Sequence, residues 1–154
     1  MILRKYEKSD LAPIVKLFKD TVYAVNSRDY TREQIDAWAG GKIDLDSWQS
    51  SLSAHDTIVA LEGNLIEGFG DAAKDGYLDR LYVHKDFQKM GVATNICDML
   101  EKLSNSEYMY THASITARAF FEKRGYCLKE ERQVLRRGII LKNYLMEKFL
   151  KKTL

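Results

Sequence analysis

One turn in the chain has the residue types and spacing of an anion-binding site at the start of a helix. It comprises Gln88, Lys89, Met90, Gly91, Val92, Ala93 and Thr94. The first backbone N–H groups of a helix lack acceptors within that helix and lie at the positive end of its dipole, so they can bind a phosphate. Gly91 lets the backbone approach an anion closely, and Lys89 adds positive charge. The sequence therefore predicts a phosphate site built largely from backbone groups.

Strand-forming residues precede this turn, and a second segment, 114–126, follows it along the chain. The residues that matter here are Leu81, Tyr82 and Val83 before the turn and Ser114, Thr116 and Phe121 in the second segment. Two motifs resemble the GNAT superfamily of acetyl-CoA-dependent N-acetyltransferases. They are Gln-x-x-Gly-x-Ala after a Tyr-Val strand end and, later in the chain, Phe-Glu-Lys-x-Gly-Tyr. The resemblance implies that all of these residues contact acetyl-CoA. It also implies that strands 77–83 and 108–113 splay apart to admit the pantetheine arm, with the amide of Val83 or a neighbour beside the thioester carbonyl.

The second segment departs from the family pattern at two positions. The resemblance places a tyrosine, often the general acid, where this chain has Phe121. It places an asparagine that often contacts the cofactor where this chain has Thr116, which keeps a hydrogen-bonding group. Tyr82, Tyr110 and Tyr126 offer phenols elsewhere, but each is also explained as a strand aromatic in or beside the core. The general acid therefore stays unassigned.

Two aspartates on neighbouring predicted strands are the candidate catalytic residues, Asp71 and Asp79. An amine with a pKa of about 10.4 is almost fully charged at pH 7, so a base that removes its proton is useful. A three-residue hairpin loop sets Asp71 opposite Asp79. When two carboxylates lie so near each other, repulsion raises the pKa of one of them, which makes it a better base. A two-residue turn at Asp75-Gly76 instead sets Asp71 opposite Arg80 as an ordinary ion pair. Solvated strand aspartates are the alternative interpretation.

The acceptor side is less defined by the sequence. Tyr23, Tyr30 and Trp38 lie in the early helical region, which lines the acceptor pocket in the family that the chain resembles. They either contact the acceptor or pack the helices together. The acidic residues of the predicted hairpin, including Asp75, favour a cationic acceptor, but its identity is not readable from the chain.

Other polar groups and glycines give weaker signals. His55, His84 and His112 are too scattered for a metal site, so no metal is expected. The Gly-Phe-Gly at 68–70 lies within a strand pattern and has no helix directly after it. That context favours a bulge or a close backbone approach over dinucleotide binding.

The elements that position these residues follow from periodicity, caps and turn signals. Strands are expected at 2–6, 57–62, 65–73, 77–83, 108–113, 126–134 and 139–149. Helices are expected from an N-cap at Ser9-Asp10 through Val22, at 31–39 after a capping box, at 46–52, from the turn through Leu103, and at 116–124 before Gly125. This order predicts the α/β fold class. It resembles the GNAT acyl-CoA N-acyltransferase fold, a mixed, mostly antiparallel sheet flanked by helices, with splayed central strands.

Composition sets the broad class of the protein. With 154 residues, 45% hydrophobic and 30% charged, residues 1–154 are expected to form a single globular domain. The chain has no apolar run of about 18 residues and no signal-peptide pattern, which predicts a cytoplasmic protein without membrane contact. Cys97 and Cys127 lack metal-ligand spacing and are expected to be free thiols. Apolar residues of the last strand, such as Ile140 and Leu145, either belong to the core or extend the sheet across a homodimer.

The leading functional hypothesis is an N-acetyltransferase that moves an acetyl group from acetyl-CoA to a primary amine of a small molecule or peptide. Transfer is expected to be direct, because no Cys or Ser has the setting of a nucleophile. A non-catalytic acyl-CoA-binding module is the alternative, motivated by Phe121. A remote alternative is nucleic-acid binding through a basic C-terminal hairpin. Its basic residues are Lys129, Arg132, Arg136, Arg137, Lys142, Lys148, Lys151 and Lys152. They form no single stripe, so a solvated face is favoured and no nucleic-acid partner is expected.

Overall fold

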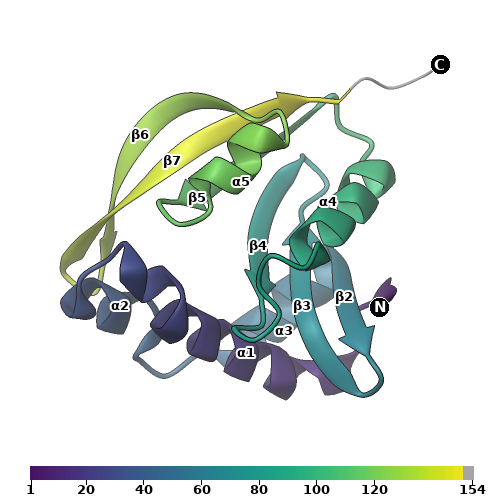
Figure 1. The fold of residues 1–154 in the computed structure, drawn as a ribbon, viewed down its shortest axis with the longest axis horizontal. Coiled ribbons are helices and arrows are strands. Elements are labelled where there is room, and N and C mark those ends of the chain that lie inside the picture. Colours follow the sequence, from purple (N-terminus) through teal and green to yellow (C-terminus); the bar gives the residue numbers. More distant parts are fainter. Residues whose placement is uncertain (151–154) are drawn as a thin grey trace.

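The computed structural model describes residues 1–150, and these form one seven-stranded sheet with helices packed on both faces (Figure 1). The strands are β1 (Ile2–Lys5), β2 (Asp56–Glu62), β3 (Leu65–Ala72), β4 (Tyr77–Val83), β5 (Tyr108–Ser114), β6 (Cys127–Arg136) and β7 (Ile139–Phe149). The α-helices are α1 (Leu11–Ala24), α2 (Arg32–Ala39), α3 (Leu45–Ala54), α4 (Val92–Leu103) and α5 (Arg118–Lys123). Short 3₁₀ turns flank α1, at Lys8–Asp10 and Asn26–Arg28. Every predicted element is present, and its ends lie within about two residues of the prediction.

The centre of the sheet is open. The strand order is β1-β2-β3-β4-β5-β7-β6, and every neighbouring pair is antiparallel except β4 and β5. These two strands run parallel and pair only at Tyr77 with Tyr110 and at Leu78 with Thr111. Beyond these pairs β4 and β5 separate, as Figure 1 shows. The splayed central strands that the resemblance implied are confirmed.

Two hydrophobic cores lie on opposite faces of the sheet, because strand side chains alternate between faces. Ile58 of β2 belongs to the core with Ile96 and Leu100 of α4, which also includes Phe121 of α5. Its neighbour Val59 belongs to the core formed with α1, α2 and α3. The helices therefore cover the central strands from both sides.

Two glycines allow α4 to pack tightly on β3. A Cβ at Gly68 would lie 2.8 Å from Val92 Cγ1, and a Cβ at Gly70 would lie 2.9 Å from Ile96 Cγ2. Both distances are shorter than normal carbon contacts, so a larger residue would push the helix away. The expected close approach at 68–70 is confirmed, and it places the start of α4 beside the open centre of the sheet.

The two predicted helix caps have different outcomes. At α2, Thr31 Oγ1 accepts from Gln34 N and the Gln34 side chain accepts from Thr31 N, so the capping box is confirmed. At α1, Asp10 is the N-cap residue, but its side chain does not cap the helix. The carboxylate instead accepts from the Arg4 guanidinium and from Glu7 N, so the expected cap interaction is wrong. A charged donor and a free backbone N–H outside the helix compete successfully for the same oxygens.

The last strand does not extend the sheet. β7 lies between β5 and β6 and is paired on both sides, whereas β1 and β6 are the edge strands. Leu141 and Tyr144 are buried, and Ile140 is exposed. The suggestion that β7 continues the sheet into a partner is therefore wrong, because its backbone hydrogen bonds are already used.

The two thiols agree with the expectation from composition. Cys97 is buried, Cys127 is exposed, and both are free. Burial raises the pKa of the Cys97 thiol to about 12. Within residues 1–150, the helices are too short or too polar to cross a membrane.

Candidate active site

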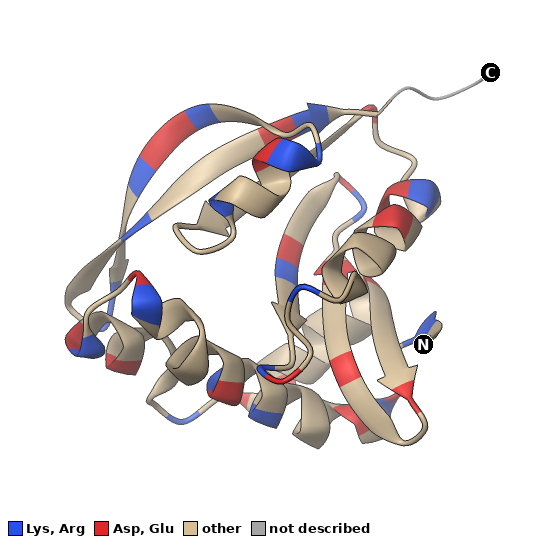
Figure 2. Cartoon of the chain, in the orientation of Figure 1, with Lys and Arg blue, Asp and Glu red and all other residues tan. Residues whose placement is uncertain are grey.

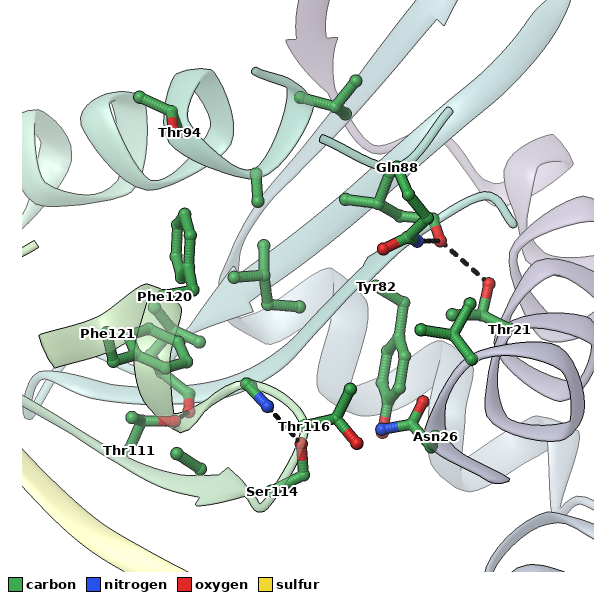
Figure 3. Close-up of a pocket in the computed structure, with 18 of the residues that line it drawn as sticks. Thr21, Asn26, Tyr82, Gln88, Thr94, Thr111, Ser114, Thr116, Phe120 and Phe121 are labelled. Atoms are coloured by element: carbon green, nitrogen blue, oxygen red, sulfur yellow. Dashed lines mark hydrogen bonds between the residues drawn. The ribbon is translucent and has the colours of Figure 1, made fainter. Parts of the chain in front are cut away.

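A cavity of about 410 Å³ opens where β4 and β5 separate, and we call it the loop-side cavity because the turn before α4 forms one wall. Of the residues expected to contact the cofactor, those that line it are Leu81, Tyr82, Val83, Gln88, Lys89, Gly91, Val92, Ala93, Thr94, Ser114, Thr116 and Phe121. Met90 is the exception, since its side chain is exposed to solvent. Figure 3 shows side chains from β4, α4, β5 and α5 converging on this space.

The turn before α4 presents a concave set of backbone N–H groups. Lys89 and Gly91 have positive φ angles of 58° and 85°, the left-handed conformation that directs successive N–H groups to one side. Gly91 is the N-cap residue of α4, and no side chain caps this end of the helix. The first hydrogen bond within the helix joins Asn95 N to Gly91 O, so the N–H groups of the three residues between them have no acceptor within the helix. This arrangement is suited to a phosphate or pyrophosphate.

Two side chains attach the end of β4 to its surroundings through one backbone oxygen. Gln88 Nε2 donates to Val83 O at 2.7 Å, and Thr21 Oγ1 of α1 donates to the same oxygen at 2.9 Å (Figure 3). The turn, the strand and α1 are therefore held together at the cavity wall. The sequence analysis missed Thr21, although a polar residue within the buried stripe of a helix was an available signal.

The backbone of β4 offers hydrogen-bond donors to the loop-side cavity. His84 N donates to Glu67 O of β3 at 2.7 Å. Successive N–H groups of a strand point to opposite sides, so the N–H groups of Val83 and Leu81 point away from β3. Because β5 has separated from β4 at this level, these two groups face the opening rather than a neighbouring strand.

The segment before α5 contains a hydroxyl without a partner. Thr116 Oγ1 is buried at the cavity wall and makes no hydrogen bond within the part of the chain that the structure describes. Ser114 Oγ, by contrast, accepts from Ala117 N at 3.0 Å and stabilises the turn that begins α5. Phe121 is buried and packs its ring against Phe120 at 5.2 Å between centroids. A buried hydroxyl that has no protein partner is a plausible contact for a ligand atom.

A second cavity, of about 330 Å³, adjoins the first. We call it the hairpin-side cavity because residues of the β6–β7 hairpin form one wall. The residues that line both cavities are Trp38, Asp79, Tyr82, His112 and Ser114. These shared residues mark the place where molecules bound in the two cavities would meet.

A β-bulge decides the relationship between the two candidate aspartates. The hairpin loop closes with Ala73 N donating to Tyr77 O at 2.8 Å, as a three-residue loop requires. One extra residue in β4, Asp79, then shifts the ladder, so that Asp71 pairs with Arg80. The predicted register with Asp71 opposite Asp79 is therefore wrong, and the alternative pairing with Arg80 is confirmed. The bulge was not anticipated, because alternation alone does not reveal an inserted residue.

The two aspartates lie in different environments. Asp71 is fully buried, lines neither cavity, and accepts from Arg80 Nη1 at 2.5 Å, while its Oδ2 lies 2.7 Å from His55 Nδ1. Burial raises the pKa of Asp71. Asp79 is 31% exposed and lines both cavities. The structure therefore brings Asp79 to the junction and places Asp71 behind it.

Asp71, Asp79 and His55 form a compact cluster around a guanidinium. Their nearest ligand-type atoms lie within 4.8 Å of one another. Arg80 Nη1 lies 2.5 Å from Asp71 Oδ2 and 3.7 Å from Asp79 Oδ2, so a side-chain cation already lies between the two carboxylates. The hydrogen bond with Asp71 raises the pKa of His55. We interpret this cluster as a support for the bulge that presents Asp79.

His112 is a site residue that the sequence analysis did not assign. It lines both cavities, and its Nδ1 lies 3.1 Å from the hydroxyl of Tyr77. Burial, together with the positive charges of Arg132 and Arg136, lowers the pKa of His112, so its imidazole is mainly neutral at pH 7. Only the pairing of β4 with β5 brings it near Asp79, and that pairing has no local sequence signal.

The three candidate phenols lie in different places, and one of them lines the cavities. Tyr82 lines both cavities, and burial raises its pKa, so the phenol keeps its proton (Figure 3). Tyr110 donates to Asp75 Oδ2 at 2.8 Å outside both cavities, and Tyr126 is buried in the core. The Asp75 carboxylate is therefore held at the hairpin turn and lines neither cavity.

Of the three residues expected to contact the acceptor, two line a cavity and one does not. Trp38 lines both cavities, and Tyr30 lines the hairpin-side cavity. The Tyr30 hydroxyl donates to Lys142 O at 2.7 Å and accepts from Ile115 N at 2.9 Å, so its polar group has a structural role. Tyr23 lines neither cavity, because its hydroxyl donates to Asp36 on the outer side of the helices.

The basic residues of the C-terminal hairpin are dispersed. Figure 2 shows positive and negative residues alternating along β6 and β7. Lys142 pairs with Glu131 at 3.3 Å, and Lys148 pairs with Glu101 at 2.7 Å. Lys151 and Lys152 lie outside the described residues. The described part of the hairpin therefore carries mixed charge rather than a basic stripe.

The turn before α4, the splayed parallel strand pair and the two adjoining cavities have the arrangement expected of an acyltransferase. Residues 26–148 match the model of the acetyltransferase (GNAT) domain. The uncharacterized N-acetyltransferase YafP of Escherichia coli K12 is 32% identical over 144 residues, which are 94% of this chain and 93% of that protein. The chain belongs to the GNAT family of acetyltransferases, whose cosubstrate is acetyl-CoA. The family and the class of enzyme that the motifs predicted are confirmed.

Solved structures share the fold over nearly the whole chain. A GCN5-related N-acetyltransferase from Rhodopseudomonas palustris has a TM-score of 0.92 and 33% identity, covering 97% of this chain and 95% of that one. A PaiA N-acetyltransferase from Thermoplasma acidophilum, solved with coenzyme A, has a TM-score of 0.78 and 15% identity, covering 96% and 98%. YncA from Salmonella typhimurium, solved with acetyl-CoA, has a TM-score of 0.74 and 16% identity, covering 100% and 96%. The last two comparisons establish likeness of fold.

Proposed function

We propose that this protein transfers an acetyl group from acetyl-CoA to a primary amine of a small molecule or peptide, by direct transfer between two bound substrates. One observation carries the proposal: the loop-side and hairpin-side cavities meet at Asp79, Tyr82 and His112. An acyl donor in one cavity and an amine in the other would meet beside a carboxylate and a neutral imidazole. Proximity of this kind is a large part of the catalysis of a bimolecular reaction.

The residues of the loop-side cavity fit acetyl-CoA. The concave N–H groups at Lys89 and Gly91 suit its pyrophosphate, and Thr116 Oγ1 offers a hydroxyl without a protein partner. When bound, acetyl-CoA supplies a thioester carbonyl that an amine can attack. The N–H groups of Leu81 and Val83 are the strand donors that can hold its carbonyl oxygen, and such donors stabilise the negative charge that develops there.

We assign the removal of the proton from the amine to Asp79. Its carboxylate reaches both cavities, attracts an ammonium ion, and can accept a proton directly or through water. His112, neutral at pH 7, faces the same space and is a second acceptor for this proton. Asp71 keeps a positioning role, because it holds Arg80 behind the bulge. The leaving thiolate, with an ordinary pKa of about 8.5, needs only modest assistance.

The positions of the thiols support direct transfer. A route through an acyl-enzyme requires a nucleophile at the junction of the cavities. Cys97 packs in the core, Cys127 begins β6, and neither lines either cavity. Ser114 does lie at the junction, but its hydroxyl accepts from Ala117 N and makes no hydrogen bond with a base in the described structure.

We further propose that residues 1–154 act as one domain. A single sheet that joins β1, near one end of the described chain, to β7, near the other, supports this organisation. A homodimer and a cytoplasmic location stay predictions. Size-exclusion chromatography with light scattering tests the first, and fractionation of cells tests the second.

The first experiment is thermal denaturation with acetyl-CoA, with free CoA and with ATP. A ligand at 100 times its dissociation constant adds roughly 2.7 kcal/mol of stability, a shift of several degrees for a domain of this size. Stabilisation by both CoA species and not by ATP, followed by amine-dependent release of thiol, would support the proposal. Stabilisation without thiol release for any class of amine would favour the non-catalytic acyl-CoA-binding module. No stabilisation at millimolar concentrations would exclude the cofactor site.

A further inference from the structure

The hairpin-side cavity has opposite charges on different parts of its wall. Asp79 lies at the junction with the loop-side cavity. Among the described residues that line the hairpin-side cavity, it is the one acidic residue. Arg136 and Lys142 line the hairpin-side cavity only. Since the amine must reach the junction to be acetylated, Asp79 lies at the amine end, whereas Arg136 and Lys142 lie on the part of the wall that the loop-side cavity does not share. Arg80, which also lines this cavity, lies 3.7 Å from Asp79 Oδ2.

The positive charges of this wall differ in how they are balanced. Arg80 is bound to the buried Asp71, and Lys142 pairs with Glu131 at 3.3 Å. Arg136 has no acidic partner among residues 1–150. One guanidinium therefore faces the hairpin-side cavity without a carboxylate from the protein. Arg136 does not line the loop-side cavity, so the phosphates of acetyl-CoA are not its evident partner.

The positive charge of Arg136 is felt inside the site. Together with burial and Arg132, it lowers the pKa of His112, which lies at the junction. It also acts on the hydroxyl of Tyr77, which lines the same cavity. An anion bound at Arg136 would therefore be close enough to influence the groups that face the amine.

We infer that the acceptor is a zwitterionic amine, which carries a carboxylate or a similar anion in addition to its amino group; this inference rests on the proposed acetyl transfer. The ammonium lies toward Asp79, and the anion pairs with the guanidinium of Arg136. Arginine suits this role because its planar donors match the two oxygens of a carboxylate. Trp38, Trp48 and Tyr77 supply aromatic wall between the charges, so ring-containing amines are suitable probes.

The test uses two pairs of amines, each an acid and its amide, which differ in the charge of the carboxyl group. L-phenylalanine and L-phenylalaninamide place the anion close to the amine, whereas 4-(aminomethyl)benzoate and 4-(aminomethyl)benzamide place it across a ring. Steady-state release of CoA thiol gives kcat and KM for each amine. Binding of each amine to the CoA-bound protein is measured in parallel by calorimetry. We expect the acid of at least one pair to have a kcat/KM about 10- to 100-fold above that of its amide, as for a charge-assisted hydrogen bond.

The matched variants are Arg136→Gln and Arg137→Gln. Arg137 is the neighbouring arginine, its guanidinium lies against Gly41, and it lines neither cavity. Arg136→Gln should raise KM for the acid about 10- to 100-fold, leave KM for the amide nearly unchanged, and spare CoA binding. Arg137→Gln should leave both amines unaffected.

The outcomes separate this inference from the proposed function. Equal kcat/KM for acids and amides, or an equal effect of Arg136→Gln on both, would overturn the anion site and leave acetyl transfer standing. Binding of an acid that depends on Arg136, without turnover of any amine, would overturn acetyl transfer and support the anion site. Absence of both binding and turnover for all four amines would overturn the zwitterionic acceptor, while stabilisation by CoA would still report on the cofactor site.

Discussion

Arg80 Nη1 lies 2.5 Å from Asp71 Oδ2, in the buried layer directly behind the junction of the two cavities. This ion pair exists because the bulge at Asp79 shifts the β3–β4 ladder by one residue. Asp79, the extra residue of the bulge, has no partner in the ladder and lines both cavities. Breaking a buried ion pair leaves a buried charge without its partner, which is costly, so this pair holds the bulge in place.

Replacing Asp79 with Asn should lower kcat about 10²- to 10⁴-fold, because the amine loses its proton acceptor. CoA affinity should stay the same, since the proposed cofactor contacts lie elsewhere in the loop-side cavity. Steady-state thiol release and calorimetry with CoA measure the two quantities. Asp75→Asn removes the same charge outside both cavities and serves as the control. An unchanged kcat in Asp79→Asn would leave His112 as the base.

Replacing Gly91 with Ala should weaken CoA binding about tenfold, which is about 1.4 kcal/mol. Its φ of 85° is unfavourable for alanine, so the concave N–H groups would relax. Gly63→Ala is the matched control, because Gly63 also has a positive φ and a Cβ at either position meets nothing within 4 Å. Both variants should lose about 1 kcal/mol of unfolding free energy. Equal CoA affinity in the two variants would contradict the role of the turn.

Thr116→Val should have opposite effects on the free and the CoA-bound protein. The free protein should keep its stability or gain up to about 1 kcal/mol, because a buried hydroxyl without a partner is removed. CoA binding should weaken several-fold, since the hydroxyl is a proposed ligand contact. In Thr111→Val, by contrast, Leu78 O loses a 2.9 Å hydrogen bond, so stability should fall by about 1 kcal/mol. A destabilised Thr116→Val protein with normal CoA affinity would refute the assignment.

The pair of His55 and Asp71 should make stability depend on pH. The hydrogen bond with Asp71 raises the pKa of His55 above its unfolded value of about 6.5. The stabilisation is therefore fully present below about pH 6.5 and is lost as the pH rises through the raised pKa. Urea denaturation of the wild type and of His55→Asn, from pH 5.5 to 8.5, should give a difference that is largest at the acidic end. A difference that is constant or grows with pH would show that the imidazole is not charged in the folded state.

Local signals were sufficient for the helices, the strands and the turn before α4. Gly91 before an amphipathic helix, the capping box at Thr31 and the glycines at 68–70 each act through neighbours in the sequence, and each prediction was confirmed. The acceptor side was harder to predict. His112 and Arg136 join the site only because β5 pairs with β4 and the β6–β7 hairpin then pairs with β5.

The sequence by itself determined the family, the order of strands and helices, and the glycine turn before α4. These depend on periodicity, on glycine conformation and on backbone groups that stay close along the chain. Only the tertiary structure decided that Asp79 enters the cavities while Asp71 is buried with Arg80. A bulge of one residue exchanges the side-chain directions of a strand without altering its hydrophobic pattern enough to be recognised. The tertiary structure likewise decided which charged residues share a cavity, since these residues lie on strands and helices far apart in the sequence.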